Sequence, residues 1–272
     1  MKHLSLLLIS IVLFSSCNSS DQSIKDFDYG TESDSSRIYY KKGWEEIMDN
    51  GRWTLSETYF RKAMTFDADF LIGKSLVGRI TQNLDERLKI FEELEASKSK
   101  LKHNERLIFD IFLSGIHRMN NRDQNIRSSS EDITNHMNLS EINFRTFVHK
   151  YPEESYIKAE YIEILHARHG AKTALDSMAV LANQHQKQLP FYITYGALLK
   201  AELKDYRTAI SDLDIIDDSL PAKPYTLASI YYKMDSLNLA KQYIDKAIHM
   251  DKNHLIAQGL KTIIDKRLNE YD

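Results

Sequence analysis

Apolar residues recur at three- and four-residue spacing from Arg37 onward, and no segment shows a convincing alternation of apolar and polar residues. Spacings of three and four place apolar side chains on one face of an α-helix. Glycine and proline are scarce, and all four prolines fall between helical patterns, where a missing backbone N–H is tolerated. Asn50-Gly51 and His169-Gly170 have the residue types of left-handed helix ends or turns between helices. The pattern predicts an all-α protein.

The helical segments also repeat, most clearly at the C-terminal end. Ala228 and Ala240 lie twelve residues apart in a unit that begins at Pro221, and Ala197 and Ala209 have the same separation in a unit that begins at Pro190. Small side chains at such positions allow two antiparallel helices to approach closely, because bulky ones would push them apart. With Leu227, Tyr231, Ile244 and Ala247 in phase, the last unit resembles the tetratricopeptide repeat.

Weaker matches to this repeat begin at Arg37, Leu71 and Ser155, and residues 103–152 form a degenerate unit. In the first of them Trp44 stands where the family has a small residue, so that contact must be rearranged. The resemblance implies a right-handed superhelical solenoid of antiparallel helix pairs over residues 37–268. A polar-faced capping helix over 253–268 would end it, followed by a tail at 269–272. The alternative is a helical bundle without repeats.

The first residues have the order of a signal peptide, with Lys2 and His3 followed by eleven mostly apolar residues from Leu4 to Phe14. That run is too short to span a bilayer, which takes about 20 residues. Ser15, Ser16 and Cys17 follow, and this segment resembles the bacterial lipobox, although Phe14 replaces the more usual leucine. The resemblance implies cleavage of residues 1–16 and lipidation of Cys17. The alternative is an ordinary secretory signal with an incidental cysteine.

Residues 17–36 are rich in serine and aspartate, so the sequence predicts a flexible tether behind the lipidated cysteine. Asp21 lies in an acidic, serine-rich stretch that loosely resembles the surface-export signals of Bacteroidota lipoproteins. Together these features predict a lipid-anchored protein of the bacterial cell envelope, at the outer membrane. The anchor would be its contact with the membrane, since no later segment has the apolar length to cross one.

The composition and the motifs of the chain argue against several classes of function. The net charge of −3 lacks the basic excess that nucleic-acid binding requires, so no nucleic-acid partner is expected. Gly73-Lys74-Ser75 matches the end of a phosphate-binding loop, but Ala68 replaces its first glycine and a helix explains these residues better. Glu163, His166 and His169 share part of a helix face, which we interpret as a solvated polar surface rather than a metal site. No enzyme activity, metal or cofactor is predicted.

The leading hypothesis is therefore a protein interaction scaffold. The first helices of stacked pairs line a concave face that suits an extended segment or a helix of a protein partner. Eight residues on that face are the candidate binding residues: Tyr156, Glu163, His166, Phe191, Thr194, Tyr225, Tyr232 and Lys233. The family's lysine and asparagine clamp for a peptide carboxylate is not reproduced. The alternatives are a carbohydrate-binding lipoprotein and an outer-membrane assembly lipoprotein.

Overall fold

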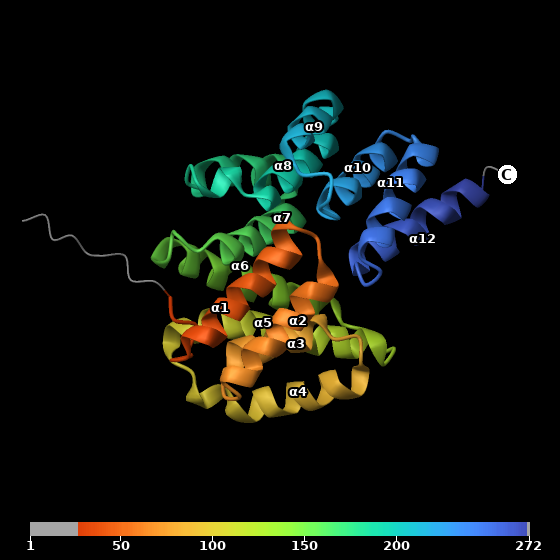
Figure 1. The fold of residues 1–272 in the computed structure, drawn as a ribbon. Coiled ribbons are helices and arrows are strands. Elements are labelled where there is room, and N and C mark those ends of the chain that lie inside the picture. The colour runs from red at the N-terminus through yellow and green to blue at the C-terminus, as the bar shows by residue number, and fades with distance from the viewer. Residues whose placement is uncertain (1–26, 271–272) are drawn as a thin grey trace, which may run out of the picture.

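The computed structural model describes residues 27–270, which fold into twelve α-helices and contain no strand (Figure 1). The prediction of an all-α protein is confirmed. The helices are α1 (Asp34–Trp44), α2 (Trp53–Phe66), α3 (Leu71–Ile80), α4 (Leu84–Ser97), α5 (His103–Asp123), α6 (Ser130–Lys150), α7 (Ser155–Leu181), α8 (Pro190–Glu202), α9 (Tyr206–Asp212), α10 (Ala222–Lys233), α11 (Leu237–Met250) and α12 (Leu255–Asn269). A short π-helix, η1 (Glu45–Asp49), follows α1. The predicted signal peptide and Cys17 lie outside the described residues.

Each helix packs against the next one along the chain, and α3 also contacts α5, α8 contacts α10, and α10 contacts α12. Short connections join consecutive helices, so neighbours in sequence lie side by side in space (Figure 1). Within residues 27–270 no helix is both long and apolar enough to cross a membrane.

Two glycines adopt the left-handed backbone conformation that the sequence predicts for helix ends. Gly170 has φ +83° and divides α7 into two helical segments. A Cβ atom on Gly170 would meet open space, so the backbone conformation rather than crowding favours glycine there. Gly51 has φ +72°, and a Cβ atom on it would lie 2.6 Å from the backbone nitrogen of Ala222. Gly51 is therefore required both by its conformation and by a close approach of α10.

Small residues lie where helices of a pair approach closely. Ala197, Ala209, Ala228 and Ala240 are all completely buried between α8 and α9 or between α10 and α11. In the first pair the hydroxyl of Ser56 donates to the carbonyl oxygen of Gly43 at 2.7 Å. Glycine at 43, not the residue at 44, thus provides the close contact between α1 and α2.

Residues 27–36 are part of the folded body, so their assignment to a flexible tether is wrong. The rings of Phe27 and Phe147 meet edge to face at 4.9 Å, and the ring of Tyr29 lies 4.5 Å from that of Tyr40. Ser33 accepts a hydrogen bond from a backbone N–H as the N-cap of α1. Two buried aromatic rings and a capping serine therefore order a stretch whose serine content resembles that of a linker.

Residues 103–152, where the repeat pattern is weakest, form the long helices α5 and α6. Ser129 begins α6 with a capping box, in which its hydroxyl accepts from the N–H of Asp132 and the Asp132 carboxylate accepts from its N–H. Phe109, Phe112 and Phe147 from this pair are buried in the same core as α1. Large aromatic side chains replace the small residues of the repeat pattern here.

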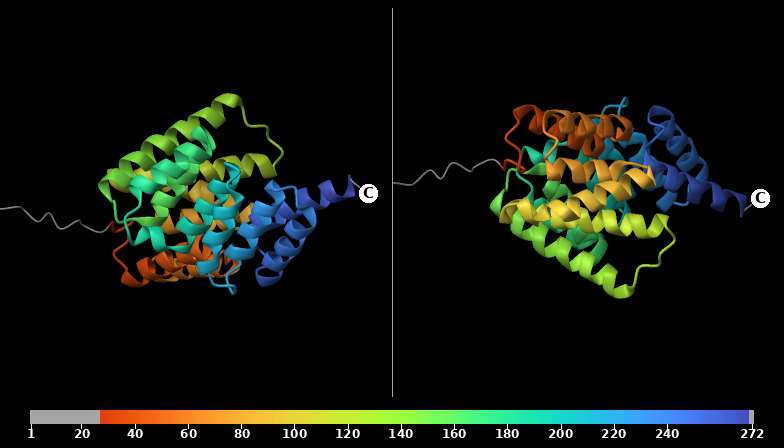
Figure 2. Two further views of the ribbon diagram at one scale, coloured as in Figure 1. Left: turned by 90° about the horizontal axis from the view of Figure 1, so that it is seen from above. Right: turned by 90° about the horizontal axis from the view of Figure 1, so that it is seen from below.

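The two ends of the helical region meet. The Thr54 N–H and hydroxyl donate to the carboxylate of Asp251 at 3.0 and 2.5 Å, and the Asn253 amide donates to the Thr54 hydroxyl oxygen at 3.1 Å. The N–H of Ala222 donates to the carbonyl oxygen of Asn50. Views from above and below show α1 and α2 beside α10 to α12 (Figure 2). The contact between first and last helices encloses the space described next.

Candidate binding cavity

A cavity of 300 Å³ lies between the N-terminal helices and the helices α7, α8, α10 and α12. Its lining is mostly apolar and includes Trp44, Phe60, Phe191 and Leu198. Ile256 also lines the cavity and is 48% exposed, so the cavity reaches the protein surface on the side of Ile256. We call this space the central cavity. Its volume is at the lower end of the range for small-molecule sites.

Asp49 at the end of η1 fixes one wall of the central cavity. Its carboxylate accepts from the N–H of Phe191 at 2.9 Å and from the hydroxyl of Tyr156 at 2.8 Å. Burial raises the pKa of Asp49, although both hydrogen bonds oppose this change. The Tyr156 ring stacks on Trp44 at 6.3 Å. One buried carboxylate thereby joins the first helix pair to α7 and α8.

The charged groups of the cavity come from α3 and α7. Arg79 forms an ion pair with Glu160 at 2.8 Å, and its guanidinium lies over the ring of Phe112 at 4.6 Å. Glu163 follows one turn after Glu160 and also lines the cavity. Among residues 27–270 it has no hydrogen-bonding or ion-pairing partner. Arg79 therefore compensates one of the two carboxylates.

The pKa of Glu163 is raised to about 8 because burial disfavours its charged form, and the charge of Glu160 adds to this effect. Arg79 lowers it by a smaller amount. At neutral pH the carboxyl group of Glu163 is consequently mostly protonated.

Aromatic rings surround these acids on the side of α8, α10 and α12. Phe191 and Tyr195 stack at 5.1 Å, and His254 lies 5.1 Å from Tyr225 and 5.8 Å from Trp53. Both ring nitrogens of His254 are buried without a partner among the described residues. Burial lowers the pKa of His254 to about 4, so its imidazole is neutral at physiological pH. The cavity therefore combines π-faces with carboxyl groups.

The structure places the eight candidate binding residues in two groups. Glu163, Phe191, Thr194 and Tyr225 line the central cavity, and Tyr156 supports its wall through Asp49. The other three lie beyond it. His166 and Lys233 both contact the carboxylate of Glu202, at 3.2 and 3.1 Å, and Arg267 covers the ring of Tyr232.

Several cavity residues were not among the sequence candidates: Trp44, Trp53, Arg79, Glu160 and His254. Glu160 had a signal in the sequence, since it lies one helical turn before a candidate residue. His254 and Trp53 had none, because they reach the cavity only through the contact between the first and last helices.

The histidines on α7 diverge rather than gather. His166 bonds to the hydroxyl of Tyr195 at 2.8 Å, whereas His169 bonds to Glu141 of α6 at 3.0 Å. No group of three or more potential ligands for a metal ion occurs within residues 27–270. Lys74 of the phosphate-loop-like segment lies on α3 and pairs with Glu93 at 3.0 Å. The histidine segment of α7 therefore lacks the geometry of a metal site, and the segment around Lys74 lacks the geometry of a phosphate-binding loop.

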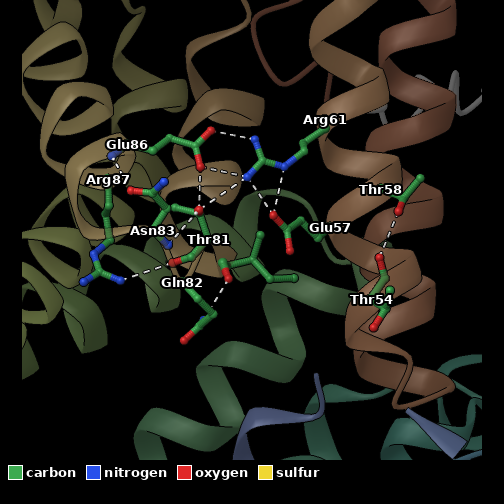
Figure 3. Close-up of polar contacts among 10 residues, drawn as sticks. Thr54, Glu57, Thr58, Arg61, Thr81, Gln82, Asn83, Glu86 and Arg87 are labelled. Atoms are coloured by element: carbon green, nitrogen blue, oxygen red, sulfur yellow. Dashed lines mark hydrogen bonds and ion pairs between the residues drawn. The ribbon is translucent and has the colours of Figure 1, made fainter. Parts of the chain in front are cut away.

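A second, polar hollow lies beside the cavity and shares Trp53 and Ile80 with it. Here Arg61 donates to Glu57 at 2.8 Å and to Glu86 at 2.7 Å, and the hydroxyl of Thr81 donates to Glu86 (Figure 3). Arg61 lowers the pKa of Glu86 to about 2, with Thr81 adding to the effect. These side chains satisfy one another, so the polar hollow is a weaker candidate for ligand binding than the central cavity.

Comparison with known proteins finds no matching family model, no matching curated protein and no matching solved structure. The function must accordingly be inferred from the side chains of the cavity and their chemistry. The combination to be explained is an apolar hollow, several aromatic rings and one carboxyl group without a partner.

Proposed function

We propose that the chain is a non-catalytic interaction scaffold whose helix pairs form a right-handed tetratricopeptide-like solenoid closed by the contact of its two ends. A segment of a protein partner would bind on the inner face and place one side chain in the central cavity. The observation that carries this proposal is the cavity itself, because four of the eight candidate residues line it together. Aromatic pockets of this kind commonly anchor binding partners.

The groups in the cavity favour binding over catalysis. The hydroxyls of Thr194 and Thr226 donate to carbonyl oxygens of their own helices, at 2.9 and 2.8 Å, rather than to a base. A nucleophile would need a base within hydrogen-bonding distance. The carbohydrate-binding alternative gains no support from the polar hollow, because Arg61, Glu57 and Glu86 already bond to one another.

A photo-crosslinking amino acid at Thr194, introduced in the native organism, tests the proposal. We expect it to capture a protein that the same amino acid at Val180 does not, because Thr194 lines the cavity while Val180 is 84% exposed on α7 and lies outside the cavity lining. Capture of the same proteins at both positions, or of none at Thr194, would contradict it.

We also propose that the protein is anchored to the outer membrane of a bacterial envelope through lipid on Cys17. The support is the resemblance of Phe14 to Cys17 to a lipobox. Replacing Cys17 by alanine should move the protein from the membrane fraction to the soluble fraction and abolish labelling with radioactive palmitate. Retention of the label in the variant would rule this attachment site out.

A further inference from the structure

The charge balance of the central cavity is incomplete. Arg79 contributes one positive charge and is paired with Glu160 at 2.8 Å, while Glu163 has no partner among residues 27–270. His254, the remaining titratable base in the lining, is neutral because it is buried. When Glu163 is ionised, the lining thus carries one uncompensated negative charge. A ligand that brings one positive charge would restore the balance.

The aromatic rings of the lining suit such a ligand as well. Tyr195 and Tyr225 line the same cavity as Glu163. Phe191 stacks on Tyr195, and Trp53 belongs to the same lining. The faces of aromatic rings attract cations, most strongly where water is excluded. The remaining lining, which includes Leu198 and Met48, is mostly apolar and matches a hydrocarbon stem.

We propose that the central cavity binds a primary alkylammonium group, supplied by a lysine side chain of the partner segment, with Glu163 as its counter-ion. This inference rests on the proposed function, because the lysine belongs to the segment that the scaffold receives. The four-carbon stem of lysine lies against the apolar lining, and its ammonium group donates to the carboxylate of Glu163.

Binding at neutral pH then releases a proton. Without a bound ammonium ion, Glu163 is mostly the neutral acid at pH 7, since its pKa is about 8. The titratable and charged groups that share the lining with it are Glu160 on its own helix, Arg79 from α3, Tyr195 from α8, Tyr225 from α10 and His254 at the start of α12. An ammonium ion favours the carboxylate, so the acid's O–H bond breaks and its proton passes to the buffer.

The two tryptophans of the chain, Trp44 and Trp53, both line the cavity, so their fluorescence reports on binding without a label. We would titrate the mature protein in detergent with n-butylammonium chloride, and with n-butanol as a neutral compound of similar length. The expected result is a saturable fluorescence change for butylammonium at concentrations at least about 10-fold lower than for butanol. Equal responses to the two compounds would overturn the proposal.

Glu163→Gln supplies the decisive variant, and Glu202→Gln is its matched control outside the cavity. We expect the first to weaken butylammonium binding at least about 10-fold and leave butanol unchanged, and the second to change neither. Leu198→Trp, which fills the cavity, should abolish both responses. Calorimetry in phosphate and in Tris at pH 7 should show release of up to about one proton per ligand, lost in Glu163→Gln. Unaltered binding in Glu163→Gln would contradict the assignment.

The outcome also separates this inference from the proposed function. If Thr194 crosslinks to a partner whose binding survives replacement of each lysine by norleucine, the scaffold stands and the lysine assignment fails. If butylammonium binds through Glu163 but no protein is captured, the amine site stands and the scaffold fails. Preference for methylguanidinium over butylammonium would reject lysine in favour of an arginine side chain.

Discussion

The N-terminal and C-terminal halves of the molecule are packed in different ways. Most of the buried hydrophobic side chains between Phe27 and Leu165 form one continuous core, rich in phenylalanine, that joins α1 to the first half of α7. From α8 to α12 the core is divided into smaller clusters in which alanine dominates, such as Ala228, Ala240, Ala247 and Ala257. The C-terminal pairs are therefore set by close backbone approach, whereas the N-terminal pairs are set by large side chains shared among several helices.

This difference explains why the repeat pattern can be recognised more clearly in the sequence of the C-terminal half than in that of the N-terminal half. An alanine pair twelve residues apart specifies its contact locally, so the pattern is visible in one hairpin. A ring such as Phe112 contacts residues of distant helices, and nothing near it in sequence indicates which they are. The two halves should then respond differently to substitutions.

The largest effect is expected for Phe147→Ala, which removes a fully buried ring from the continuous core. The free energy of unfolding should fall by about 3–5 kcal/mol, because a cavity replaces the ring and Phe27 loses one of its edge-to-face partners. Chemical denaturation followed by circular dichroism measures this loss. A cost below that of Ala228→Leu would reverse the comparison between the halves.

Ala228→Leu tests the C-terminal half, where added volume rather than lost volume should be harmful. The wider side chain would separate α10 from α11, and we expect a loss of about 1–3 kcal/mol. Val180→Leu, on an exposed position, is the control and should change little. Hydrogen exchange should locate the loosening in α10 and α11; uniform loosening of all helices would show that the two cores are not separate.

Glu163 lies on α7, where the two halves meet, and Glu163→Gln should change how the stability of the protein depends on pH. The pKa of Glu163 is raised to about 8 in the folded protein from its ordinary value of 4.5, so the folded state holds the proton more tightly than the unfolded state. Stability of the natural protein should therefore fall as pH rises from 4.5 to 8. At pH 9 the full shift would correspond to about 5 kcal/mol. Because the side chain of Glu163 is only half-buried, solvent reduces this difference, and we expect the variant to be more stable by about 1–2 kcal/mol. At pH 4 the two should agree. Thermal melts across this range would detect the divergence of the two stability curves, and parallel curves would refute the shifted pKa.

The smallest effect is expected for Asp251→Ala, which removes the acceptor for Thr54. We expect a loss of about 1 kcal/mol and faster exchange of the Thr54 amide, since that N–H would lose its partner. Asp245→Ala, which removes an exposed ion pair with Lys261, is the control. If Asp251→Ala leaves the exchange of Thr54 unchanged, other contacts hold the two halves together.

Local features of the fold could be predicted from the sequence. Helical periodicity, the left-handed conformations at Gly51 and Gly170 and the buried alanine pairs all depend on residues close to one another in the chain. The tether prediction failed over residues 27–36 because Phe27 and Tyr29 find partners more than 100 residues away or on the next helix, in a stretch whose composition is otherwise polar.

The central cavity could be predicted only in part. Candidates on α7, α8 and α10 followed from their positions in successive units. The opposite wall could not, because Trp53, Thr54 and His254 meet through contacts between residues nearly 200 positions apart. In sequence Thr54 and Asp251 are ordinary polar residues at helix ends, and their bond exists only after every intervening helix has been placed.

The bonds between Thr54 and Asp251 also restrict how this protein can change in evolution. Chains built from helical hairpins commonly lengthen or shorten by duplication or deletion of whole units. Here an added hairpin would move Asp251 away from Thr54, and a deleted one would force the two ends into each other. Natural variation should accordingly favour point substitutions and changes in loop length over changes in the number of hairpins.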